Sequence, residues 1–363
     1  MTDVSYIQIA LELAKKGKGL VSPLPMAGAV YVKNNKIIGA AYRSNQHEEP
    51  AEILAIKNSK ESVEDSFLYT NLEPCTTCQK DIACIDYIIQ SKIKKVVIGS
   101  VNPHPSFGGM AVKKLKRAGI EVKTGVLEKE CIELNKFYFK HCTNSVPYVT
   151  MKMAVTIDGK IADSDYNSKW ITSVESRSLV HELRSSYDAV LVGIKTVKAD
   201  NPKLDVRLVE GRNPKRIVID SKLEIDPEFK VIKANKDNNV IVITSKKNKT
   251  KKRKLQKLLN HGVEVIFVPE EKDGRVDLVN ALKKIGGKNI ISVLVEGGGK
   301  VFSSFIKAKL DDEILIFIGP KILGNGIPLA DGLGIKSIQK AFSYCIKDMD
   351  KVGEDALLKL VRR

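Results

Sequence analysis

The sequence predicts a protein of two α/β domains, and three observations support that prediction. The chain has 363 residues, more than one hydrophobic core usually serves. In both halves, short segments rich in Val and Ile alternate with segments of helical periodicity, which is typical of a mostly parallel sheet with helices on both faces. In the second half, the apolar segments are nearly continuous, as expected for strands buried on both faces.

The first half contains predicted elements in a regular alternation. Apolar residues at helical spacing predict a helix over residues 4–17. An alternating pattern around Asn34 and Asn35 predicts a hairpin, because both residue types tolerate a positive φ. Pro50 is placed to open a helix that carries Glu52. The later elements are the strands FLYTNL, KKVVIGSV and IEVKTG and the helices CIDYIIQSKI and MAVKKLKRAG.

The polar cluster Thr143-Asn144-Ser145 marks the expected boundary between a domain of residues 1–145 and a domain of residues 146–363. A dense basic run over residues 246–257 is interpreted as the solvated start of a helix. The strands predicted beyond the boundary are YVTMKMAVT, DAVLVGI, KRIVIDS, NVIVITS, EVIFVP and ISVLVEGGG.

Composition and charge restrict the class of protein. No segment approaches the roughly eighteen uncharged apolar residues of a membrane span. The N-terminal stretch has early acidic residues and no cationic leader, so a cytoplasmic enzyme is expected. The formal net charge of +17 is compatible with nucleic-acid binding, but the basic residues are spread through both halves. A phosphorylated small substrate and a dinucleotide cofactor suit this charge, so we expect no nucleic-acid or membrane partner.

The stretch HEEPAEILAI, followed about twenty residues later by LEPCTTCQKDIAC, nearly matches the signature of a zinc-dependent deaminase. Such a site needs one imidazole and two thiolates to bind Zn²⁺ and a Glu to transfer protons. Glu52, Cys75 and Cys84 stand at the expected positions. Pro50 stands where the imidazole is required, and proline has no side-chain donor atom.

The first 145 residues or so resemble the deaminase half of the bifunctional riboflavin-biosynthesis deaminase-reductases. The matching stretches are SPLPMAGAV, PAE, LEPC and VNPHP followed by KKLKRAGIEV, in that order and spacing. The resemblance implies a cytidine-deaminase-like three-layer domain. It also implies that Cys75 and Cys84 are metal ligands and that Glu52 is the proton shuttle of the catalytic site.

The chain departs from this family at three positions. Pro50 replaces the metal-binding His, Leu24 replaces an Asn that would bind the pyrimidine, and Arg43 replaces a His. A substitute metal ligand is available in Cys78 or in His47, so a rearranged catalytic zinc site and a structural zinc both stay open. We nevertheless expect a vestigial site and a lost deaminase activity, with a fully bifunctional enzyme as the alternative.

From residue 147 onward, the chain resembles the reductase half of the same family over roughly two hundred residues. The matching stretches are MKMAVTIDGKIA, SKWITS, HELRSSYDAVLVGIKTVKADNPKLDVR, RIVIDS and LVEGGGKVFSSF. The resemblance implies a dihydrofolate-reductase-like domain that uses NADPH to reduce the ribosylamino group of a phosphorylated pyrimidine to a ribitylamino group. Hydride transfer requires orientation and the exclusion of water, which the protein supplies.

Specific residues of this half are expected to form the reductase site. The glycines of EGGGKVF follow a strand and open a helix, so their N–H groups can approach a cofactor diphosphate. Arg184 and Arg207 are planar donors that suit a substrate phosphate. The resemblance implies cofactor contacts from Ala154, Trp170, Thr196, Asp200, Ser221, Gly297, Gly298 and Gly299. It implies substrate contacts from Ser168, Arg184, Leu204, Arg207 and Glu296.

Structural roles are the alternatives for several of these residues. Each arginine is alternatively a surface charge, and Trp170 alternatively packs in a core. Asp158 is interpreted as a turn residue before Gly159, and Glu52 is alternatively an exposed or capping carboxylate. The sequence leaves open whether the cofactor is NADPH or NADH and whether the pyrimidine is deaminated before it is reduced. A homodimer is expected.

Overall fold

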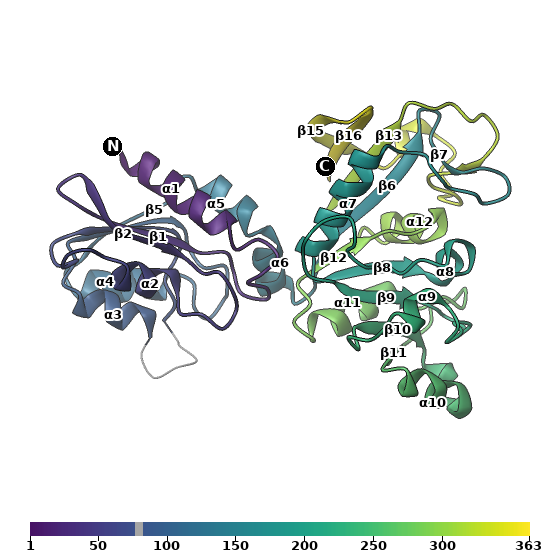
Figure 1. The fold of residues 1–363 in the computed structure, drawn as a ribbon, viewed down its shortest axis with the longest axis horizontal. Helices are drawn as coiled ribbons and strands as arrows, with labels where there is room; N and C mark the ends of the chain where they lie inside the picture. The colour runs from purple at the N-terminus through teal and green to yellow at the C-terminus, as the bar shows by residue number, and fades with distance from the viewer. Residues whose placement is uncertain (77–82) are drawn as a thin grey trace. The chain divides into compact units, whose positions relative to one another are not determined.

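The computed structural model describes residues 1–76 and 83–363, which divide into two compact units, Met1–Ser145 and Val146–Arg363 (Figure 1). The described helices of the first unit are α1 (Asp3–Lys15), α2 (Ala51–Lys57), α3 (Cys84–Gln90), α4 (Met110–Arg117), α5 (Glu128–Leu134) and α6 (Lys136–Asn144). Its described strands are β1 (Gly28–Lys33), β2 (Lys36–Tyr42), β3 (Phe67–Leu72), β4 (Lys95–Ser100) and β5 (Glu121–Thr124).

The sheet of the first unit has the strand order β2-β1-β3-β4-β5. The predicted hairpin joins β1 to β2, and both Asn34 (φ 49°) and Asn35 (φ 60°) have a positive φ there. Strand β1 is antiparallel to both β2 and β3, whereas β3, β4 and β5 are parallel to one another. The expectation of a mostly parallel sheet is therefore wrong for this unit, because the hairpin adds two antiparallel pairings.

Helices cover both faces of this sheet (Figure 1). Helices α1 and α5 lie on one face and α2, α3 and α4 on the other. The alternation of side chains along β1 produces the two cores: Val30 and Val32 pack against Ile7 of α1, while Ala29 and Tyr31 pack with the helices opposite. A three-layer domain follows from this arrangement, as the sequence predicted.

A buried carboxylate, that of Glu73, joins the end of β3 to α4. Its Oε2 accepts hydrogen bonds from the backbone N–H groups of Asn102 and Gly109, both at 2.9 Å. Its Oε1 accepts from the N–H groups of Ala111 at 2.9 Å and Val112 at 3.3 Å. The first N–H groups of a helix have no partner inside the helix, so this carboxylate satisfies donors that would otherwise be buried alone.

We expect Glu73→Ala to lower the free energy of unfolding of the first unit by roughly 3 kcal/mol, since each buried N–H group that loses its acceptor costs about 1–3 kcal/mol. The midpoint of urea denaturation measures this change. Glu121→Ala is the matched control, because the Glu121 side chain is 67% exposed and pairs with Lys95 at the surface. Equal destabilisation by both substitutions would contradict the role given to Glu73.

The second unit is described throughout. Its helices are α7 (Val174–Ser186), α8 (Ile194–Asp200), α9 (Lys230–Lys233), α10 (Lys252–Asn260), α11 (Leu278–Gly286) and α12 (Gly299–Lys307), with short 3₁₀ turns η1 (Lys246–Thr250) and η2 (Ile338–Lys340). Its strands are β6 (Tyr148–Thr156), β7 (Lys160–Ala162), β8 (Ala189–Gly193), β9 (Lys215–Ile219), β10 (Val240–Ser245), β11 (Glu264–Val268), β12 (Ser292–Val295), β13 (Glu313–Gly319), β14 (Ile327–Pro328), β15 (Tyr344–Val352) and β16 (Asp355–Arg362).

Nine strands of this unit form one sheet in the order β11-β10-β9-β8-β12-β6-β13-β16-β15. The pairings from β11 to β13 are parallel, and β16 and β15 add an antiparallel edge. Alternate residues of β13 face opposite sides. Leu315 and Phe317 pack with Val180 of α7, whereas Ile314 joins the core formed with α11 and α12. The predicted sheet with helices on both faces is therefore present here.

The basic run over residues 246–257 forms η1 and the start of α10, and most of its side chains are exposed, as predicted. No helix within the described part of the chain is long and apolar enough to cross a membrane.

Candidate functional site

A cavity of about 800 Å³ opens in the second unit where the carboxyl ends of β8, β9 and β12 meet the first turns of α8 and α12. Ligands of open α/β sheets commonly bind beyond the carboxyl ends of the strands. The cofactor residues expected from the sequence that line the cavity are Ala154, Thr196, Asp200, Ser221, Gly297, Gly298 and Gly299. The expected substrate residues that line it are Ser168, Arg184, Leu204 and Glu296.

Two of the expected site residues, Trp170 and Arg207, are not among the residues that line the cavity. Trp170 is 59% exposed, and the guanidinium of Arg177 lies 4.2 Å from the centre of its ring. The alternative that Trp170 packs in a core is therefore wrong. Arg207 is also exposed, and its Nη1 donates to Asp205 Oδ1 at 2.6 Å. Contacts of either residue with a ligand stay predictions.

The glycine loop Gly297–Gly299 connects β12 to α12 at the wall of the cavity. The N–H of Gly298 donates to Thr196 Oγ1 at 3.1 Å, which joins the loop to α8. A Cβ on Gly299 would lie 3.0 Å from the carbonyl oxygen of Pro328, so a side chain has little room there. The loop therefore exposes backbone rather than side chains at the N-terminus of a helix, an arrangement that suits a diphosphate.

Glu296, which directly precedes this loop, holds a buried ion pair with Arg184. Arg184 Nε donates to Oε1 at 2.6 Å and Nη2 donates to Oε2 at 2.9 Å. The Nζ of Lys152 lies 3.7 Å from Oε2 on the other side. Burial alone would raise the pKa of Glu296, but the charges of Arg184 and Lys152 lower it to about 2. The carboxylate therefore stays ionised at neutral pH.

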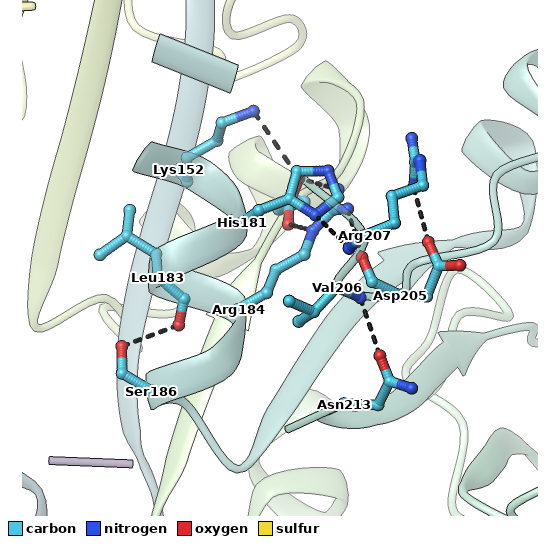
Figure 2. A network of polar contacts seen from close by, with 10 residues as sticks. Lys152, His181, Leu183, Arg184, Ser186, Asp205, Val206, Arg207 and Asn213 are labelled. Carbon is cyan, nitrogen blue, oxygen red and sulfur yellow. Dashed lines mark hydrogen bonds and ion pairs between the residues drawn. The ribbon is translucent and has the colours of Figure 1, made fainter. Parts of the chain in front are cut away.

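Figure 2 shows the polar network around this pair, with His181 and Arg184 on one helix and the segment of Asp205 and Arg207 beside them. Arg184 Nη1 donates to the carbonyl oxygen of Asp205 at 3.1 Å, and the N–H of Arg207 donates to His181 Nδ1 at 3.1 Å. Burial, followed by the charges of Arg184 and Arg207, lowers the pKa of His181 to about 4. His181 is therefore neutral at pH 7 and accepts this hydrogen bond.

Arg184 and Arg207, which the sequence analysis assigned together to a substrate phosphate, make different contacts in the structure. The paired donors of Arg184 contact Glu296, and its side chain is only 12% exposed, so the alternative of a surface charge is wrong for Arg184. Arg207 is 51% exposed and keeps donors that Asp205 does not use. Of the two, Arg207 has the more exposed guanidinium, and its contact with a phosphate stays a prediction.

Sequence reasoning did not select Lys152 or His181. Lys152 interrupts the apolar pattern of β6, a strand buried along most of its length, and this was the available signal. His181 lies one turn before Arg184 on α7, a spacing that places both on one face.

Asp158, the expected turn residue, and the expected ligand contacts Ser168 and Asp200 all make hydrogen bonds in the second unit. Asp158 Oδ1 accepts from Thr156 Oγ1 at 2.6 Å and from the N–H of Leu323 at 3.0 Å, which supports its interpretation as a turn residue. Ser168 Oγ donates to Asp200 Oδ1 at 3.5 Å beside the cavity, and burial raises the pKa of Asp200.

The deaminase-like residues of the first unit also lie together. Glu52 is 4% exposed, so the alternative of an exposed carboxylate is wrong. Its Oε1 accepts from Thr70 Oγ1 at 3.1 Å and its Oε2 from Cys84 Sγ at 3.5 Å. A hydrogen bond with Cys75, then burial and the charge of Glu52, raises the pKa of the Cys84 thiol well above its usual range. These contacts place the thiol of Cys84 against the side chain of Glu52.

Three positions were considered in the sequence analysis as the remaining zinc ligand, and they differ in their side chains and surroundings. Pro50 is the N-cap of α2 and makes no side-chain cap. His47 is exposed, with its Nε2 3.2 Å from Gln46 Nε2, and Cys78 lies outside the described residues. Among the described residues, no group of three His, Cys, Asp or Glu side chains is placed to hold a metal ion.

Tyr31 adds a bulky group near this place. Its side chain is fully buried, and burial followed by the charges of Glu52 and Cys84 raises its pKa well above the usual range. Its hydroxyl has no hydrogen-bond partner among the described residues. A buried polar atom without a partner is unfavourable, so the Tyr31 hydroxyl is a cost to the stability of this unit.

Two family models match the chain. The model described as the RibD C-terminal domain matches residues 147–358, and the model described as the cytidine and deoxycytidylate deaminase zinc-binding region matches residues 1–100. Among curated relatives, the riboflavin biosynthesis protein RibD of Aquifex aeolicus is 42% identical, with 98% of this chain and 97% of the relative covered. That of Escherichia coli is 31% identical, with 99% and 100% covered.

Solved structures give the same result. RibD of Acinetobacter baumannii superposes with a TM-score of 0.90 at 28% identity, with 99% of each chain covered. The diaminohydroxyphosphoribosylaminopyrimidine deaminase/5-amino-6-(5-phosphoribosylamino)uracil reductase of Thermotoga maritima has a TM-score of 0.87 at 36% identity, also with 99% of each chain covered. The predicted succession of a cytidine-deaminase-like fold and a dihydrofolate-reductase-like fold is confirmed.

Proposed function

Since the chain belongs to the RibD family of riboflavin biosynthesis, with a deaminase domain followed by a reductase domain, we propose that it reduces a phosphoribosylaminopyrimidine with NADPH and that its deaminase domain is catalytically inactive. The substrate is 5-amino-6-(5-phosphoribosylamino)uracil or its diamino precursor. The observation that carries the reductase proposal is the ionised carboxylate of Glu296 between two cations beside the glycine loop.

The residues of the cavity fit a nicotinamide dinucleotide. The backbone of Gly297–Gly299 and the N-terminus of α12 suit the diphosphate, and Ala154 and Ser221 also line the cavity. When bound, NADPH supplies the hydride that reduces C1 of the ribosyl group. The cavity walls hold the reacting carbon close to the cofactor and exclude water, which is the main contribution that the protein makes to hydride transfer.

Lys152 is the proposed proton donor of the reaction. Reduction at C1 breaks the bond between C1 and the sugar-ring oxygen, so that oxygen needs a proton. Lys152 lines the cavity, and burial lowers its pKa. Lys152 therefore releases a proton more readily than an exposed lysine. Glu296 holds both Lys152 and Arg184 in place, and the neutral His181 supports the segment that follows Asp205.

The proposal that the deaminase domain is inactive rests on the side chains that are available to bind zinc. Cys75, Cys84 and Glu52 remain, but the imidazole position is Pro50, and a catalytic zinc needs three stable protein ligands and an open position for water. The match of residues 1–100 to a zinc-binding family favours the second candidate, a bifunctional enzyme whose zinc site is completed by another residue.

An assay of the full chain tests the proposal. We expect NADPH to be oxidised in the presence of one of the two pyrimidines, with the ribitylamino product identified by mass spectrometry. Parallel reactions with NADH and with each pyrimidine establish the cofactor and the order of reduction and deamination. No oxidation of NADPH or NADH with either pyrimidine would contradict the reductase proposal.

A further inference from the structure

Residues 321–331, which follow β13 and are called the wall segment here, form one side of the cavity. Ile327 and Pro328 of this segment line the cavity. The segment also lies against the glycine loop, since a Cβ on Gly299 would be 3.0 Å from the carbonyl oxygen of Pro328 and 3.2 Å from that of Leu329. The position of the wall segment therefore limits the space around the first turn of α12.

The wall segment has little apolar packing of its own. Residues 321–325 are all exposed, with Ile322 77% and Leu323 41% exposed. The pairing of β14 with β7 extends over two residues of the segment, Ile327 and Pro328. A stretch of chain with so few buried contacts opens easily unless polar contacts hold it.

Asp158, in the turn after β6, supplies such contacts from the other end of the domain sequence. Its Oδ1 accepts a hydrogen bond from the N–H of Leu323 at 3.0 Å, and its Oδ2 accepts from the N–H of Gly324 at 2.7 Å. A hydrogen bond from Thr156, followed by those from the two N–H groups, lowers the pKa of Asp158 to about 2. The carboxylate is therefore ionised at neutral pH, and both of its oxygens accept.

The backbone of the same turn contacts the wall segment on either side of these two N–H groups. The N–H of Ile157 donates to the carbonyl oxygen of Lys321 at 2.8 Å, and the N–H of Leu329 donates to the carbonyl oxygen of Gly159 at 3.0 Å. The backbone bonds thus hold the two ends, and the carboxylate of Asp158 holds the exposed stretch between them.

We propose that Asp158 is a positioning residue for dinucleotide binding, because it fixes the wall segment against the glycine loop. The inference rests on the proposed reductase function. Asp158 does not line the cavity, so it acts through Leu323 and Gly324 rather than by contact with a ligand. A wall that is already in place costs less conformational entropy when the cofactor binds.

Hydrogen–deuterium exchange of the full chain without ligand tests the first step. We expect Asp158→Ala to raise the exchange rate of the amides of Leu323 and Gly324 roughly tenfold, because both lose their acceptor. Asp226→Ala is the matched control. Asp226 is an exposed aspartate whose Oδ1 accepts from the N–H of Glu228 at 2.9 Å, and it does not line the cavity.

Fluorescence titration with NADPH and with NADH tests the second step. Asp158→Ala should raise the Kd of both cofactors roughly tenfold, since both have the diphosphate that the glycine loop suits. Asp158→Asn keeps one acceptor oxygen and should have a smaller effect. The kcat at saturating cofactor should stay within roughly twofold of wild type, because Lys152 and Glu296 are unchanged.

Four results would overturn the inference. Unchanged exchange in Asp158→Ala would show that the carboxylate does not hold the wall segment, and faster exchange throughout the second unit would assign it to general stability. Faster exchange of the segment with an unchanged Kd would separate the segment from cofactor binding. Equal effects in Asp226→Ala would show a general effect of surface charge. Failure of the unmodified chain to bind either dinucleotide would instead overturn the proposed function, and the exchange experiment distinguishes that failure from the others.

Discussion

Glu296→Gln is expected to reduce the kcat/KM of pyrimidine reduction roughly a hundredfold or more, a typical loss when one charged group of a preorganised site is removed. The amide cannot neutralise Arg184 and Lys152, which keep their charges in a largely buried place. Removing one partner of a buried ion pair commonly costs about 3–5 kcal/mol of stability. Steady-state kinetics and urea denaturation measure the two effects separately.

Arg184→Lys is the graded comparison. It keeps the charge but loses the paired planar donors that contact both oxygens of Glu296, so we expect a smaller loss of kcat/KM, on the order of tenfold. The Kd of NADPH should change little in either variant, because the glycine loop is intact. Wild-type kcat/KM in folded Glu296→Gln would contradict the role given to this carboxylate.

The same pair has a predictable pH dependence. The folded-state pKa of Glu296, about 2, lies below its ordinary value of 4.5. The unfolded chain therefore binds this proton first as pH falls, and the stabilisation is present above about pH 4.5 and lost as pH falls toward 2. The difference in unfolding free energy between the wild type and Glu296→Gln should shrink over this range.

The unmodified chain is expected to release no ammonia from the diaminopyrimidine, even with zinc supplied. Pro50 offers no ligand, and Leu24 has no amide to bind the edge of the pyrimidine. Restoring both positions with Pro50→His and Leu24→Asn tests this reason directly. We expect the double variant to bind zinc, measured by elemental analysis, and to gain turnover from a background of zero.

Controls separate the causes of any failure in that experiment. Glu52→Gln in the restored chain should keep zinc but abolish turnover, because the resemblance to deaminases assigns Glu52 the role of proton shuttle. Zinc without turnover in the double variant would direct attention to Arg43 or to the buried phenol of Tyr31. Ammonia release by the unmodified chain, abolished by Cys78→Ser or His47→Ala, would overturn the proposal and identify the substitute ligand.

Local sequence patterns predicted the elements whose formation depends on nearby residues. Asn34 and Asn35 form a hairpin because their own backbone preferences suit the turn, and the Val/Ile runs form strands because burial on both faces selects such residues. Helix α6 and strand β15 are among the elements that were not predicted. Helix α6 has no buried residue to produce an apolar period, and most of β15 is an exposed edge strand.

The candidate site was predicted less completely, for a different reason. The glycine loop and most lining residues stand in recognisable motifs. The roles of Lys152 and Arg184, however, depend on a carboxylate that follows another strand, with Glu296 112 residues after Arg184 in the chain. These ion pairs form only when the parallel sheet brings strands that are distant in the sequence together. Local sequence patterns therefore do not predict them.

The backbone contacts of Glu73 show that one residue of the deaminase signature has a structural role. Glu73 precedes Cys75 in the LEPC motif, yet its carboxylate serves α4 rather than a substrate. Cys84, the last residue of the signature, is the first residue of α3 and is fully buried in the core. Folding alone therefore requires Glu73 and favours a small buried residue at position 84, whether or not a metal is bound, so these two letters of the motif report on the stability of the domain as well as on its chemistry.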